Sequence, residues 1–144
     1  MGFLAGENIT AGRLNRLQPK QYFAQASGTL GASQTSQDIP GVTVTFNTEQ
    51  PNAIYTAHLV TDFDWDGGTT SLASSRIKVD GAFPINLFAV AQMSITTDRA
   101  TNGQNYRGTL GSAGSHTITA VGTTSANQMI NFYSSLLVVV YEVV

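Results

Sequence analysis

Short runs rich in threonine, valine, isoleucine and aromatic residues fill the chain from Gln21 onward, and glycine, asparagine, aspartate or proline interrupts them. This pattern is typical of β-strands joined by turns. No stretch repeats apolar residues at a 3.6-residue period over three turns, so the crossover helices of a parallel sheet are missing. The sequence therefore predicts an all-β, antiparallel two-sheet sandwich, for which the jelly roll is the commonest arrangement.

Nine segments are expected to form the strands of this sandwich. They cover residues 22–27, 42–46, 54–65, 71–79, 86–96, 106–110, 116–123, 129–133 and 135–144. A chain of 144 residues buries roughly 70% of its unfolded surface, which is enough for one core but leaves no room for a second domain.

The composition excludes several classes of protein. Charged residues make up 11% of the chain, against a usual value of about 25%, and the net charge is −2. Nucleic-acid binding needs a basic face and disorder needs high net charge, so neither is expected.

The absence of cysteine excludes disulfides and thiol catalysis, and no apolar run reaches the ~18 residues of a membrane span. Because no signal peptide is recognisable, the protein is expected to fold in the cytoplasm where it is made.

The first twenty residues differ from the rest because they hold three of the seven basic residues of the chain. Thr10 is expected to cap a short helix over residues 11–17. A helix of this length is not stable alone in water, so it needs a partner surface. We therefore predict an attachment arm over residues 1–20 and a jelly-roll domain over residues 21–144. The residues expected to bind the partner are Arg13, Leu14, Arg16, Leu17 and Lys20.

The last segment, residues 135–144, is apolar on both faces of the predicted strand, whereas a sandwich strand normally buries one face and exposes the other. One face carries Leu136, Val138, Val140, Glu142 and Val144, and the other carries Leu137, Val139, Tyr141 and Val143. Either a second copy of the chain or another part of the same chain must cover the second face. Which face points inward stays open, so the predicted interface residues are Leu136, Leu137, Val138, Val139, Val140 and Tyr141.

Two stretches carry a family resemblance. Ala113-Gly-Ser-His-Thr-Ile-Thr-Ala-Val-Gly122, with the closing Val140-Tyr141-Glu142, resembles the tumour-necrosis-factor-like (TNF-like) jelly-roll domains in structural proteins of tailed bacteriophages. The opening Ala5-Gly-Glu-Asn-Ile-Thr-Ala-Gly-Arg-Leu-Asn-Arg-Leu-Gln-Pro19 resembles the attachment arms of phage virion proteins. The resemblance implies a homotrimer on a virion, assembled in the host cytoplasm, with the final strand along the trimer axis.

Two positions on the particle are compatible with this resemblance. The first is a decoration or cement protein on the outside of the capsid, bound through its arm to the major capsid protein or another virion protein. The second is a minor tail or fibre-head protein that binds a host surface glycan. Phe63, Trp65 and Tyr106 are the candidate sugar-facing aromatics, with closure of the core as their alternative role. The host and the lattice partner stay open.

Neither catalysis nor a cofactor is predicted. Asp62, Asp64 and Asp66 resemble the start of a calcium loop, but Ala73 stands where the bidentate glutamate should be. As a strand, this segment places the aspartates on one face and Phe63 and Trp65 on the other. No metal is therefore predicted there. The two histidines have no nucleophile motif to serve, so the protein is not expected to be an enzyme.

Overall fold

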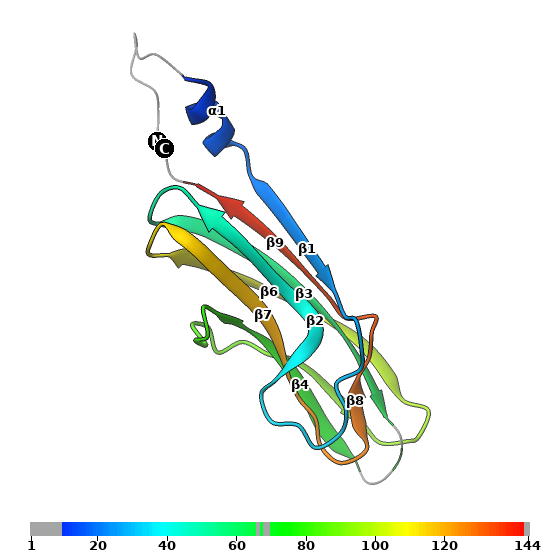
Figure 1. Ribbon diagram of the computed structural model, residues 1–144. Coiled ribbons are helices and arrows are strands. Elements are labelled where there is room, and N and C mark those ends of the chain that lie inside the picture. The colour runs from blue at the N-terminus through cyan, green and yellow to red at the C-terminus, as the bar shows by residue number, and fades with distance from the viewer. Residues whose placement is uncertain (1–9, 66, 68–69, 143–144) are drawn as a thin grey trace.

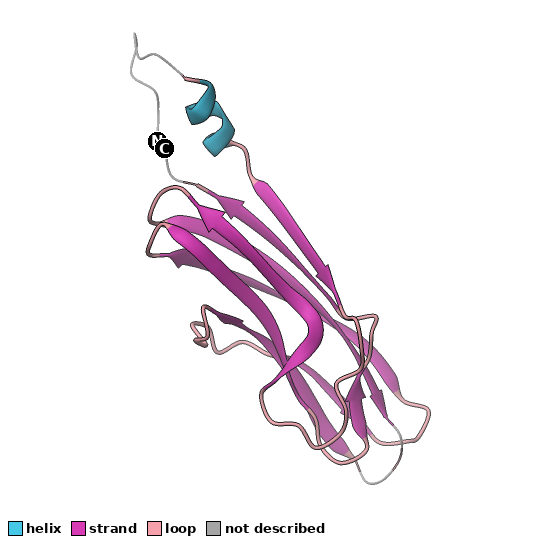
Figure 2. Cartoon of the chain, in the orientation of Figure 1, coloured by secondary structure: helices cyan, strands magenta, loops and turns pink. Residues whose placement is uncertain are grey.

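The computed structural model describes residues 10–65, 67 and 70–142. Within these residues one short helix precedes nine strands, and Figures 1 and 2 show their arrangement. In chain order the elements are α1 (Ala11–Leu17), β1 (Lys20–Gln25), β2 (Gln37–Thr48), β3 (Ala53–Trp65), β4 (Ser71–Val79), β5 (Ala89–Met93), β6 (Arg99–Leu110), β7 (Gly114–Thr123), β8 (Gln128–Ile130) and β9 (Ser135–Tyr141). The helix has the predicted bounds, and the Thr10 side chain accepts a hydrogen bond from the Arg13 backbone N–H.

The strands form two antiparallel sheets that face each other. Sheet A has five strands in the order β1-β9-β3-β6, with β8 paired to β3. Sheet B has four strands in the order β2-β7-β4-β5. Figure 1 shows the long strands of both sheets running along the molecule, with α1 beyond one end. The predicted all-β antiparallel jelly-roll sandwich is confirmed.

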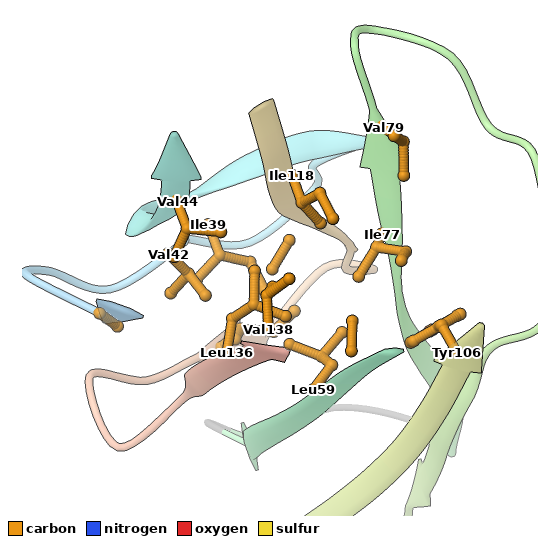
Figure 3. Packing of buried hydrophobic residues seen from close by; sticks show 14 of the residues in the cluster. Ile39, Val42, Val44, Leu59, Ile77, Val79, Tyr106, Ile118, Leu136 and Val138 are labelled. Atoms are coloured by element: carbon orange, nitrogen blue, oxygen red, sulfur yellow. The ribbon is translucent and has the colours of Figure 1, made fainter. Parts of the chain in front are cut away.

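The core lies between the two sheets because alternate side chains of each strand point inward. In β3, for example, Tyr55, Ala57 and Leu59 are buried, while His58 between them is exposed. Figure 3 shows Val42, Val44, Ile118, Leu136 and Val138 gathered in this layer. At ~25 cal/mol per Å² of apolar surface, this burial is the main favourable contribution to folding.

β2 bends at Gly41, and this bend lies against Ser27, which follows β1 in the chain. The register of β2 against β7 shifts between Asp38 and Thr43. Gly41 has φ of 81°, and a Cβ atom there would lie 2.6 Å from the Ser27 Oγ atom. The Ser27 N–H donates to the Pro40 carbonyl at 2.9 Å. Only glycine combines this φ with such close approach, so the bend depends on this residue.

The structure decides which face of the closing strand points inward. β9 lies between β1 and β3, and Leu136, Val138 and Val140 are each at most 1% exposed in the core. These three residues are therefore removed from the predicted interface, because the sandwich itself covers them. Leu137 and Val139 are half-buried and Tyr141 is 45% exposed on the opposite face. Val143 and Val144 lie outside the described residues.

Several strand predictions had the wrong extent; β2, for example, begins at Gln37, five residues before the predicted start. β6 begins at Arg99, seven residues before the predicted start, because the whole polar stretch pairs with β3 in continuous register. The expected strand over residues 86–96 is limited to Ala89–Met93. The strand predicted over residues 129–133 is only Gln128–Ile130, which leaves Phe132 and Tyr133 exposed in the turn before β9.

A candidate assembly surface on sheet A

The outward side chains of β1, β9, β3 and β6 form what we call the outer face of sheet A. Strand pairing places them in rows. In one row Val139 lies between Gln21 and Thr56, and Thr56 is followed by Arg107. In the next row Leu137 lies between Phe23 and His58, and His58 is followed by Asn105.

Apolar side chains form a continuous stripe along this face. Its members are Phe23, Ile54, Val60, Leu137, Val139 and Tyr141. Phe23 is 64% exposed, the largest exposed fraction among the large apolar side chains of the described chain. An apolar stripe of this size on a mainly polar surface is typical of a protein–protein contact.

Two neighbouring depressions hollow the outer face. The larger has a volume of about 700 Å³, and we call it the β3–β6 groove. Its lining comprises outward residues of β9, β3 and β6, the buried residues Ala57 and Tyr106, and Ile85 and Leu87 from the segment before β5. The smaller measures about 370 Å³ and is lined by Ile54, Thr56, Arg107 and Tyr141.

The outer face of sheet B is different in character. There the hydroxyl groups of Thr43 and Thr119 lie 3.1 Å apart, and those of Thr45 and Thr117 lie 3.2 Å apart. Lys78 pairs with Asp38 beside them at 2.5 Å. Exposed apolar side chains, such as Leu72, occur on β4 and β5 at the margin. The two sheets therefore differ in what they present: a largely hydroxylated face on sheet B and an apolar stripe on sheet A.

The arm residues have two kinds of environment. Leu14 and Leu17 are 50% and 44% exposed, and none of the seven residues of α1 is buried. In contrast, Arg16 pairs with Glu49 at 3.2 Å and Lys20 pairs with Glu142 at 2.9 Å. Two of the basic side chains predicted to bind a partner are therefore engaged by the jelly roll itself. Lys20 also belongs to β1, the first strand of the sandwich.

Glu142 fixes the junction between the arm and the sandwich. Its carboxylate accepts hydrogen bonds from the Lys20 Nζ and from the Glu49 backbone N–H, both at 2.9 Å. Burial by itself raises the pKa of Glu142, but the hydrogen bonds from Lys20 and Glu49 outweigh it, so the pKa lies below its usual value.

Replacing Glu142 by glutamine is expected to destabilise the protein at pH 7 by about 1.5–3 kcal/mol, because hydrogen bonds to a charged group are lost. A carboxyl whose folded pKa is lowered stabilises the protein above its unfolded pKa of ~4.3, and this contribution disappears as the pH falls through the folded pKa. The Glu142→Gln variant should therefore lose less stability than the parent chain on acidification. Urea unfolding at pH 7 and in acid measures this, with Asp38→Asn as the surface ion-pair control. Equal losses on acidification in both proteins would contradict the assignment.

The three candidate sugar-facing aromatics do not face solvent. Phe63, Trp65 and Tyr106 are at most 3% exposed and all belong to the core. Burial raises the pKa of Tyr106 to about 12. The prediction that they form a sugar platform is wrong, and their alternative role in closing the core is correct. Phe132 and Tyr133 are two of the rings that are exposed, and their centroids lie 4.6 Å apart.

The aspartates after Thr61 are paired within the chain. Arg99 donates to the Asp62 carboxylate from Nε at 2.9 Å and from Nη2 at 2.5 Å, and the Asn131 Nδ2 donates to Asp64 at 2.7 Å. The pairing with Asp62 raises the pKa of Arg99. Asp66 lies outside the described residues. Within the described ranges no group of three His, Asp or Glu side chains is arranged to hold a metal ion.

Both histidines have polar partners and no nucleophile among the described residues. The Nδ1 atom of His58 lies 2.6 Å from the Asn105 Oδ1 atom on the outer face of sheet A. His116 is buried, with Nδ1 2.8 Å from the Asp80 carboxylate and Nε2 3.0 Å from the Ser112 carbonyl.

No helix in the described part of the chain is long and apolar enough to cross a membrane.

Sequence reasoning missed several members of the stripe. Phe23, Ile54 and Val60 belong to segments that were correctly predicted as strands, but their outward orientation was not assigned. The signal was present in Phe23, because the inward residues of β1 are Tyr22 and Ala24 and an exposed phenylalanine between them is unusual.

This chain resembles known proteins in its fold and not in its sequence. No protein-family model and no curated protein matches the sequence. Among solved structures, Eiger TNF from S. frugiperda is similar, with a TM-score of 0.54 and 9% identity over 83% of this chain and 90% of that chain. The globular domain of zebrafish complement 1qA protein has a TM-score of 0.49 and 11% identity over 86% of this chain and 97% of that chain. The infectious bursal disease virus Gx strain structure has a TM-score of 0.49 and 15% identity, over 86% of this chain and 33% of that chain.

The similarity to Eiger TNF shows that the chain has a TNF-like jelly-roll fold. This confirms the fold that the sequence resemblance implied. At 9% identity the comparison concerns the arrangement of strands and no individual residue.

Proposed function

We propose that this protein is a non-enzymatic structural component of a phage virion, a homotrimer that decorates and cements the capsid. The observation that carries the proposal is the apolar stripe on the outer face of sheet A. A TNF-like jelly roll fits a structural or binding role, and the phage setting rests on the sequence resemblance of residues 5–19 and 113–122.

Self-association accounts for the stripe in energetic terms. Covering three or four of its side chains contributes on the order of 5 kcal/mol per subunit at ~25 cal/mol per Å², before the entropic cost of association. The remaining face, on sheet B, stays in water with its threonine hydroxyls. Three copies of the arm on one particle raise the effective concentration of the second and third contacts, so weak single contacts give lasting attachment.

The arm is the proposed link to the particle. Leu14 and Leu17 are exposed on α1 and bury against the lattice, while Arg16 connects α1 to the jelly roll through Glu49. The proposed partner on the particle is the major capsid protein or another virion protein.

Truncation tests this link. A chain that begins at Pro19 keeps Lys20 and its pair with Glu142, so the sandwich is expected to remain folded and trimeric. Its binding to undecorated particles is expected to fall at least about 100-fold, because three arm contacts are lost together. Co-sedimentation measures the binding and native mass spectrometry measures the oligomer, with the full chain as the control. Undiminished binding would remove the arm from the proposal, and a native mass near 15.3 kDa for the full chain would remove the oligomer.

The second candidate function is a minor tail or fibre-head protein that binds a host surface glycan. The exposed pair Phe132 and Tyr133 favours it, since the apolar face of a sugar stacks on an exposed ring. Arg99 lies 5.1 Å from the Tyr133 ring and Asn131 lies on the same turn. Glycan-array binding that disappears in Tyr133→Ala would favour this function over decoration.

A further inference from the structure

An exposed ring and a groove lie beside each other on the outer face of sheet A. Phe23 projects from β1, the edge strand at one margin, and is 64% exposed. The β3–β6 groove of about 700 Å³ begins at Leu137 and Val139 of the neighbouring strand β9 and extends to Asn105 and Arg107 of β6 at the other margin. The ring lacks a cover and the groove lacks an occupant among the described residues.

The ring of Phe23 does not fill the groove of its own chain. Phe23 pairs with Leu137, which is one wall of the groove, but its side chain is 64% exposed and is not among the lining residues. The far wall is distant from it, because β9 and β3 separate β1 from β6 and place Phe23 and Asn105 three strand spacings apart, or about 14 Å. The groove can therefore receive the ring of another molecule.

The groove has the chemistry that a phenyl ring requires. Leu137, Val139 and Leu87 supply apolar walls. Two of its polar lining groups are already hydrogen-bonded to each other, with the Nδ1 atom of His58 2.6 Å from the Asn105 Oδ1 atom, which reduces the cost of covering them. Arg107 also lines the groove, and a cation beside an aromatic face is attracted by the ring.

We infer that Phe23 of each copy inserts into the β3–β6 groove of the next copy. This inference rests on the proposed function, in which the outer face of sheet A is the contact between copies. Because the ring and the groove are different surfaces, the contact is heterologous, and such contacts close into a ring when the rotation between copies allows it. In a trimer each copy gives one ring and receives one, so all three grooves are filled.

A cross-linking experiment tests the contact directly, because the chain has no cysteine of its own. The double variant Phe23→Cys, Asn105→Cys and a second pair, Phe23→Cys with Leu87→Cys, are treated with a short bis-maleimide whose reach is less than the separation within one chain. The expected product is a covalently closed three-chain species on a denaturing gel. Each single-cysteine variant is the matched control and should give no closed ring.

The substitution Phe23→Ala provides an independent measurement. The trimer dissociation constant is expected to rise at least about 30-fold, since a buried aromatic anchor of an interface is removed. Leu72→Ala, which truncates a 57% exposed side chain on sheet B, should leave the constant unchanged. Far-UV circular dichroism checks that both variants are folded.

The outcomes separate this inference from the proposed function. A trimer by native mass that gives no cross-link and tolerates Phe23→Ala would overturn the inference and leave the proposed assembly standing. A closed two-chain product would overturn the threefold ring in favour of a twofold pair. A parent chain that stays at 15.3 kDa at all concentrations would overturn both.

Discussion

Replacing Leu137 with arginine is expected to give a folded monomer of 15.3 kDa. Leu137 lies in the middle of the stripe, between Phe23 and His58, so its side chain is central to any contact made through the outer face of sheet A. A guanidinium at that place must lose its hydration without a carboxylate to pair with, which costs several kcal/mol per subunit. Association should weaken by more than about 100-fold.

Light scattering coupled to gel filtration measures this effect. The matched control is Thr45→Arg, which places the same charge on an exposed strand position of sheet B. It should leave the oligomer intact, because that face remains in water in the proposed assembly. A Leu137→Arg protein that keeps the mass of the parent assembly would show that another surface joins the copies.

Replacing the preceding residue, Leu136, with alanine is expected to act on folding instead of assembly. Leu136 is 0% exposed in the core, and truncating such a leucine costs about 2–5 kcal/mol through lost burial and the cavity left behind. The free energy of unfolding is best measured by urea in the Leu137→Arg background, because association of copies would add to the apparent stability.

Tyr141 lies on the opposite face of the same strand, so its replacement is the control for Leu136→Ala. It is 45% exposed on the outer face, so Tyr141→Ala in the same monomeric background should change the free energy of unfolding by no more than about 1 kcal/mol. A similar loss for both variants would mean that the two faces of β9 are equally buried in the isolated chain.

Local features of the chain were predictable because their causes lie within a few residues. The helix over residues 11–17 follows from the Thr10 cap and the stop at Pro19, and the structure places it there. The strand over residues 71–79 has the predicted bounds, since a period of two and the flanking turns define it. The antiparallel sandwich follows from the lack of crossover helices.

Other features depended on partners far away in the sequence. The polar stretch 99–105 has no strand signal of its own, yet it is part of β6 because β3 offers it a continuous row of hydrogen bonds. Phe63 and Trp65 were predicted to share one face, but only the packing of sheet A against sheet B decides that this face is the core. Phe132 and Tyr133 became exposed because β8 ends at Ile130.

The closing strand shows most clearly which features the sequence determines and which only the tertiary structure decides. Its sequence determined that β9 has two apolar faces, because alternation along a strand is a property of the backbone. The sequence could not decide which face is covered, since Leu136 and Leu137 are chemically identical and differ only in direction. The tertiary structure decided it by placing sheet B over Leu136, Val138 and Val140 and leaving Leu137, Val139 and Tyr141 on the open side. The physical reason is that burial belongs to the contact between layers, and that contact is made by residues distant in the chain.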